Sequence, residues 1–180
     1  MEIVGAETPG LEPIAVSDAS GFETMFRAQY ARIARVIAGV IRDPARAEEL
    51  TVEVFLKFWK STAARGERAE GWLRKAAVRK AIDELRRRER RARYEGLFHF
   101  GKRTPTPEEL RGVTEGQERV RAVLAAIDKR QAELLLLRNQ GLSYSELASA
   151  LDLNPVSIGT LLARGQRTFR KEYIRRYGKD

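Results

Sequence analysis

The sequence predicts an all-α protein built from two small helical domains that are joined by a flexible linker. Apolar residues recur at helical spacing through two long stretches of the chain, and no stretch shows the sustained alternation that is typical of a β-strand. Glycine and proline interrupt the pattern between these two stretches. We therefore expect a mobile N-terminal tail, a first domain, a linker and a second domain, at residues 1–19, 20–95, 96–117 and 118–177.

The composition limits the class of protein. The chain has 180 residues, 43% of them hydrophobic, and a formal net charge of +9, which fits one or two small domains with a polyanionic partner. It contains no cysteine, and hence no disulfide framework or thiolate metal site, which suits a cytoplasmic protein. No apolar run reaches the length of a membrane span, and the N-terminus lacks the pattern of a secretory signal.

The polar residues do not form a pattern typical of an enzyme. The chain has no glycine-rich phosphate loop and no metal-ligand cluster, and its one histidine, His99, stands alone in the linker. We therefore expect no catalytic residue, no metal and no cofactor.

Two helices are predicted at the start of the first domain. Ser20 and Glu23 form a capping box, from which an apolar stripe runs to Ile41. Asp43 is placed to cap a second helix, with Pro44 in its first turn, and this helix extends to about residue 61. Its outer face is acidic.

The acidic face of the second helix suggests a contact with another molecule. Glu49 and Glu53 are four residues apart and therefore lie on one face, where two like charges destabilise a helix slightly. A face that keeps such a pair is suited to a basic partner, although acidic helix faces are often only solvated.

A third helix, predicted at about residues 71–93, combines an apolar face with a basic one. Its inward positions carry Leu73, Ala77, Val78, Ala81, Ile82 and Leu85. Its outer stripe is largely basic and leads into the run RRRERRAR, which only Glu89 interrupts. Contact with phosphates is the favoured interpretation of this stripe, since Lys and Arg clustered along one helix are the electrostatic signature of nucleic-acid binding.

The second domain ends in a predicted helix-turn-helix. Ser143 and Glu146 form a capping box that starts a short helix over residues 144–151. After the turn, Asn154 is a good N-cap and Pro155 suits the first helical position of the next helix. That helix begins with small polar groups and continues into arginines, which suits the major groove. An αα-hairpin with a basic, solvated face explains these residues equally well.

Taken in order, these segments resemble the extracytoplasmic-function (ECF) sigma factors of bacterial RNA polymerase. The first domain is similar to their region 2 in DPARAEELTVEVFLKFW and GWLRKAAVRKAIDELRRRERR, and the second to their region 4 in LLLLRNQGLSYSELASALDLN and the helix that follows. The similarity covers about residues 22–177, apart from the linker. It implies a dissociable subunit that binds core polymerase and directs promoter recognition, melting and initiation.

The resemblance also implies roles for particular residues. The acidic helix would dock on the clamp helices of the polymerase β′ subunit through Glu48, Glu49, Val52 and Glu53. The loop at residues 61–70 and the third helix would hold the melted −10 element, with Trp72, Lys75, Arg79, Lys80, Arg86 and Arg87 in contact with DNA. The recognition helix would read the −35 element through Asn154, Ser157, Thr160, Arg164 and Arg167, while the helix before it approaches the β flap. An anti-sigma factor is a further implied partner, and we expect a monomer when the protein is free.

Several positions depart from the family pattern. Val52 stands where a glutamine is usual, and Val78-Arg79 stands where an Arg-Asn pair is usual. Gly159 and Leu161 occupy places that often carry Lys and Arg in the recognition helix. These changes place −35 recognition in more doubt than polymerase binding. Two other functions therefore stay open: a stand-alone helix-turn-helix regulator, and a protein-binding module derived from a sigma factor.

Overall fold

The computed structural model describes residues 16–61, 69–98 and 115–178, and all regular structure within these ranges is helical. The first part of the chain contains α1 (Val16–Ile41), α2 (Pro44–Lys60) and α3 (Ala69–Phe98). The second part contains α5 (Glu115–Ala126), α6 (Lys129–Asn139), α7 (Tyr144–Leu151), the 3₁₀ turn η2 (Pro155–Ser157) and α8 (Ile158–Tyr177). Most of the predicted tail, of the predicted −10 loop at residues 61–70 and of the predicted linker lies outside the described residues.

The first three helices form a bundle around one apolar core. The inward positions predicted for the third helix are all buried in α3, where they pack against buried residues of α1 and α2 such as Ile33, Ile37, Leu50 and Phe55. Aromatic rings extend this core, because Phe22 lies edge-on to Trp59 with ring centroids 4.7 Å apart. The periodicity of the sequence therefore correctly predicted the buried faces of these helices.

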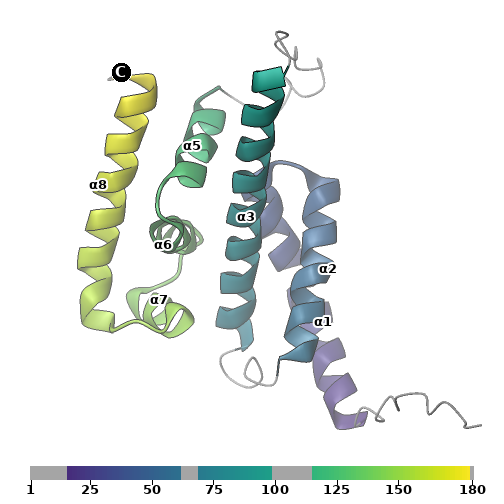
Figure 1. The fold of residues 1–180 in the computed structure, drawn as a ribbon. Helices are drawn as coiled ribbons and strands as arrows, with labels where there is room; N and C mark the ends of the chain where they lie inside the picture. The colour runs from purple at the N-terminus through teal and green to yellow at the C-terminus, as the bar shows by residue number, and fades with distance from the viewer. Residues whose placement is uncertain (1–15, 62–68, 99–114, 179–180) are drawn as a thin grey trace, which may run out of the picture.

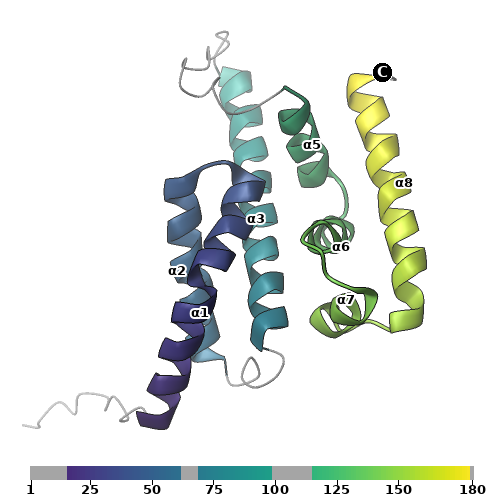
Figure 2. The same ribbon diagram turned by 180° about the vertical axis from the view of Figure 1, so that it is seen from behind.

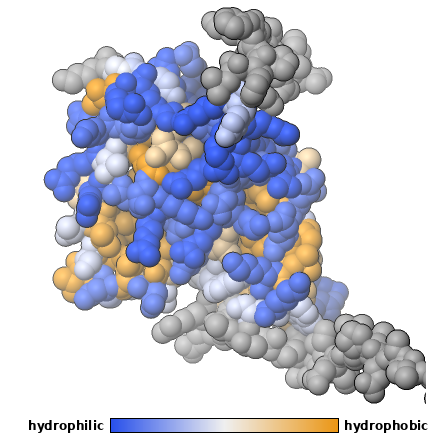
Figure 3. Space-filling view, viewed as in Figure 1, coloured by the Kyte–Doolittle hydropathy of each residue, from blue (hydrophilic) through white to orange (hydrophobic). Residues whose placement is uncertain are grey.

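Helix α3 lies at the centre of the molecule and packs on two sides. Figures 1 and 2 show α1 and α2 against one side of α3, and the column of α5, α6 and α7 against the other. Helix α8 forms the outer layer beyond that column and contacts α5, α6 and α7. The face of the molecule seen in Figure 3 is mainly hydrophilic. Because α3 has neighbours on both sides, its basic stripe is not fully open to solvent.

Two predicted boundaries of helices were wrong. Helix α1 begins at Val16, so Ser20 lies inside the helix, where its carbonyl accepts a hydrogen bond from the Thr24 hydroxyl at 2.9 Å, and is not an N-cap. Helix α3 extends to Phe98, because its charged end still consists of good helix formers and gains an i,i+4 pair between Glu89 and Arg93. Across the described ranges, no helix is both long and apolar enough to cross a membrane.

Candidate nucleic-acid and protein interfaces

The helix-turn-helix is fixed by local hydrogen bonds that the sequence predicted. The capping box of α7 is complete, since the Ser143 hydroxyl accepts from the Glu146 N–H while the Glu146 carboxylate accepts from the Ser143 N–H. These hydrogen bonds hold the pKa of Glu146 below its usual range. In the turn, Asp152 adopts the left-handed conformation with φ 58°. The side-chain oxygen of Asn154 then accepts from the Val156 N–H at 3.0 Å and caps the 3₁₀ turn that leads into α8.

Helix α8 turns its apolar residues inward and leaves the predicted −35 residues exposed. Ile158 and Leu162 are buried, whereas Ser157, Thr160 and the arginines Arg164 and Arg167 are exposed. No ion pair to either arginine occurs within residues 16–61, 69–98 and 115–178. The predicted −35 residues thus form an open strip that begins at a capped helix end.

One exposed residue of this strip was missed in the sequence. Val156, in the 3₁₀ turn before α8, has 88% of its surface exposed, more than any other large hydrophobic residue that the structure describes. A single valine after a proline carries no periodic signal, so the pattern could not distinguish it from a core residue. Its position beside Ser157 places apolar surface at the start of the strip.

The two glycines of α8 differ in their surroundings. A Cβ on Gly159 would lie 3.7 Å from the Tyr144 ring, which is an ordinary contact. Gly165 is buried against Leu135 of α6, and a Cβ there would lie 3.5–3.7 Å from three of its side-chain atoms. Leu161 is half-buried against the core. Both glycines therefore face neighbours within the second part of the chain.

The acidic face of α2 is exposed but partly neutralised from within the chain. Glu48, Glu49 and Val52 are exposed, and Leu56 adds apolar surface one turn beyond Val52. Arg46 donates to Glu49 at 2.5 Å, and Lys80 of α3 donates to Glu53 at 2.5 Å. The sequence indicated an acidic pair that is suited to a basic partner or is only solvated. This interpretation was incomplete, because Arg46 is three residues before Glu49 and Lys80 is brought in by the packing of α3.

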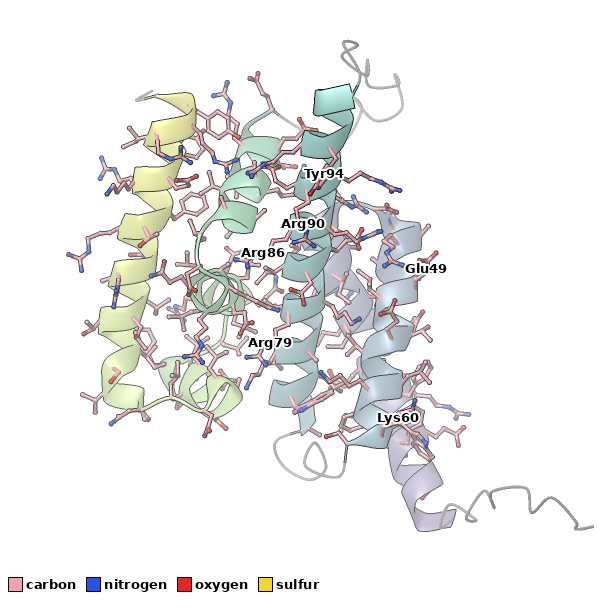
Figure 4. All side chains as sticks on the ribbon, viewed as in Figure 1. Glu49, Lys60, Arg79, Arg86, Arg90 and Tyr94 are labelled. Atoms are coloured by element: carbon pink, nitrogen blue, oxygen red, sulfur yellow. The ribbon has the colours of Figure 1, made fainter. Side chains whose placement is uncertain are left out.

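The predicted −10 residues of α3 are brought together along one helix, but most of them already have partners. Trp72 is half-buried with its ring 5.8 Å from that of Phe58, so it belongs to the core. Arg79 donates to Glu133 of α6 at 2.9 Å, and Arg86 donates to the backbone carbonyl of Ile127 at 2.6 Å. Figure 4 shows Arg79 and Arg86 on the side of α3 that faces α5 and α6.

Two further residues of the predicted −10 set, Lys75 and Arg87, lie in different environments. Lys75 lines a cleft of about 650 Å³ between α2, α3 and the start of α6, where burial, followed by the nearby Arg79 charge, lowers its pKa. Arg87 donates to both oxygens of Glu84, at 2.8 and 3.0 Å.

Two buried carboxylates that organise these arginines were missed in the sequence. Glu84 is 4% exposed and also accepts from Arg88 at 3.1 Å, and Glu133 is 2% exposed. Burial raises the pKa of Glu84, but hydrogen bonds from Arg87 and Arg88 outweigh this effect and lower it to about 2. A signal was present, because each glutamate falls on the apolar stripe of its own helix, as Glu133 does with Leu136 and Leu137.

Profiles of known protein families match both parts of the chain. Sigma-70 region 2 matches residues 25–91, and sigma-70 region 4 matches residues 117–168. Together the two regions cover about two thirds of the 180 residues and follow each other in the order that the sequence predicted.

Similar proteins with known names agree with these profiles. The ECF RNA polymerase sigma factor SigK of Mycolicibacterium vanbaalenii is 27% identical over 179 residues, which span 95% of this chain and 91% of that protein. SigK of Mycobacterium tuberculosis strain H37Ra is 26% identical over 169 residues, with 89% of each chain covered. Among solved structures, CnrH in complex with the cytosolic domain of CnrY shares the fold, with a TM-score of 0.51, 18% identity and coverage of 87% of this chain and 92% of that one.

Proposed function

This chain belongs to the ECF sigma factors of the sigma-70 family, and we propose that its exposed faces divide polymerase docking and promoter reading between them. It is an RNA polymerase sigma factor, so it acts with core polymerase and promoter DNA in transcription initiation and performs no covalent chemistry of its own.

The observation that carries the proposal is the open strip of α8. Ser157 and Thr160 are exposed at the start of α8 and would reach base edges in the −35 major groove, while Arg164 and Arg167, exposed further along the helix, would contact phosphates. Small hydroxyl groups near the capped end allow the helix to approach the bases closely. Among the described residues no ion pair holds these arginines, so DNA has none of these to break.

The exposed face of α2 is the proposed docking site for the clamp helices of the β′ subunit. Glu48 and Glu49 supply negative charge. Val52 and Leu56, which lie one helical turn apart, supply apolar contact surface. A charged rim around a small apolar centre is the usual composition of a protein interface. The β flap as a contact of the second domain, and an anti-sigma factor as a further partner, are predictions from the family resemblance alone.

Titration against bacterial core polymerase, followed by transcription from a pool of promoter fragments, tests the whole proposal. We expect one-to-one binding and selective initiation, and the selected fragments define the −35 and −10 sequences. Replacement of both Glu49 and Glu53 by arginine should abolish core binding. Glu23→Arg is the matched control, because Glu23 is also an exposed acid in a helical pair, with Arg27 of α1, but lies away from the proposed face.

The same selected promoter tests the −35 strip. Replacement of Arg164 and Arg167 by alanine removes two phosphate contacts, so it should weaken promoter binding and reduce the salt slope by about two. An unchanged salt slope after replacement of Arg164 and Arg167 would contradict the assignment of the −35 strip. Core binding that survives replacement of Glu49 and Glu53 by arginine would contradict the assignment of the α2 face.

A further inference from the structure

Val156 is an apolar residue that the described part of the chain leaves almost fully exposed. It has 88% of its surface exposed, whereas Ile158, two residues later, is fully buried. Single exposed hydrophobic residues are common on folded proteins, so the exposure matters only together with the position of the residue. Val156 stands in the 3₁₀ turn at the start of the helix that is proposed to enter the −35 major groove.

Val156 lies on the same side of the helix as the proposed DNA contacts. Ser157 and Ile158 both have right-handed helical backbone angles, so the 3₁₀ turn continues into α8 without a break. The opposite face, with Ile158 and Leu162, is buried. Three exposed residues of the −35 strip follow Val156 at the spacing of one helix face, at intervals of four, eight and eleven residues: Thr160, Arg164 and Arg167.

Local interactions hold Val156 in place. Its N–H donates to Asn154 Oδ1 at 3.0 Å, and the Ser157 N–H donates to the Asn154 carbonyl oxygen at 3.0 Å. Pro155 restricts the backbone just before it, and a β-branched valine side chain has few rotamers. A contact made by Val156 therefore costs little conformational entropy.

The chemistry around Val156 favours an apolar feature of the bases. Residues 155–163 include no charged side chain, so hydroxyl groups and apolar surface are what the start of α8 offers to the groove. Gly159 and Ala163, which follow Val156 on the same side, add little bulk beside it. Among the groups that base pairs present in the major groove, the C5-methyl group of thymine is the one suited to an apolar contact.

We propose that Val156 contacts the C5-methyl group of a thymine in the −35 element and so selects an A·T pair at that position. The inference rests on the proposed function, because it assigns a base to the strip that Thr160, Arg164 and Arg167 continue. Burial of one methyl group gives about fourfold in affinity. The contact involves no charge, so it adds nothing to the salt slope.

Deoxyuridine tests this contact, because it pairs as thymidine does but lacks the C5-methyl group. Each thymine of the −35 element in the selected promoter, on either strand, is replaced by deoxyuridine in turn, and binding of the reconstituted holoenzyme is measured. We expect one replacement to weaken binding of the unmodified protein about fourfold. Val156→Ala should bind the thymine promoter more weakly by a similar factor, with an unchanged salt slope, and should no longer distinguish thymine from uracil at that position.

Val120→Ala is the matched control. Val120 of α5 is also an exposed valine, with 40% of its surface exposed, but it lies outside the helix-turn-helix. This variant should distinguish thymine from uracil as the unmodified protein does. Because Val156 is so exposed, its replacement should leave the fold and core polymerase binding unchanged.

Three results would overturn the proposal. They are a selected −35 element without thymine, equal binding of the unmodified protein to all uracil-containing promoters, and a Val156→Ala variant that still distinguishes the two bases. Weaker binding of Val156→Ala to core polymerase, with unchanged base selectivity, would assign Val156 to a protein contact and would also overturn it. Initiation that is insensitive to uracil removes this inference alone, whereas a protein that initiates at no promoter fragment removes the proposed function as well.

Discussion

Glu84 is a carboxylate on the buried face of α3 that holds several arginines at once. Arg87 and Arg88 donate to it at 2.8–3.1 Å, and Arg46 of α2 approaches it at 3.4 Å. Two of these arginines come from its own helix, and Arg46 ties α2 to α3. The pKa of about 2 follows because these hydrogen bonds outweigh the effect of burial on the charged form.

Glu84→Gln should therefore destabilise the protein in a pH-dependent way. The folded-state pKa is about 2 against an ordinary value of 4.5, so the carboxylate stabilises the fold at neutral pH and loses that effect as the pH falls from about 4.5 towards 2. We expect a loss of about 3 kcal/mol at pH 7 and about half of that at pH 3, in the free energy of unfolding by urea. Glu23→Gln, at an exposed pair, should change stability little at either pH. An equal loss from Glu84→Gln at both pH values would contradict the assignment.

Helix α8 combines strong end signals with a weak interior. The Asn154 cap and Pro155 start the 3₁₀ turn that leads into α8. Bidentate hydrogen bonds from Arg175, with a further one from Arg176, hold Glu172 near the end of α8 and lower the pKa of this glutamate to about 2. Between the ends stand Gly159 and Gly165, which lower helix stability relative to alanine. Neither adopts the positive φ that would require glycine.

Gly159→Ala should stabilise the protein by about 0.5–1 kcal/mol, because the space beside Tyr144 admits a methyl group at an ordinary contact distance. The measurement is urea unfolding followed by circular dichroism. Gly165→Ala is the comparison, and we expect a smaller gain because its methyl group must fit against three atoms of Leu135. A loss of stability in Gly159→Ala would contradict the prediction that the space beside Tyr144 admits a methyl group.

At the scale of the whole molecule, α3 is shared by two packing partners. Its apolar face belongs to the bundle with α1 and α2, and its basic stripe belongs to the contact with α5, α6 and α7. The Lys129–Asp83 pair spans this contact without belonging to either core, so it can be reversed with little local cost.

A charge reversal at this pair should have a small, salt-dependent effect on stability. Lys129→Glu places two carboxylates opposite each other, and it should lower the free energy of unfolding by urea by about 0.5 kcal/mol. Adding Asp83→Lys restores opposite charges and should restore the stability. Urea unfolding at low and high salt provides the measurement, since salt should reduce the difference. Equal stability of all variants at low salt would show that this pair does not hold α3 and α6 together.

The sequence by itself determined the class of fold, the buried faces and the caps of the helix-turn-helix. Each of these features depends on residues within about four positions, as in the Ser143–Glu146 box, the Asn154 cap and the apolar stripe of α3. The family also followed from the order of such segments. The start of α1 was predicted wrongly, because a capping box such as Ser20–Glu23 can also occur within a longer helix.

Only the tertiary structure decided which charged residues are available. Arg79 and Glu133 are 54 residues apart and Lys80 and Glu53 are 27 apart, and no periodicity within either helix links such partners. Arg79 and Arg164 are both exposed arginines on amphipathic helices, yet Arg79 is held by the buried Glu133 carboxylate, whereas Arg164 has no ion pair among the described residues. The difference arises from packing, because α3 has a neighbour on each side, whereas no described helix packs on the outer face of α8.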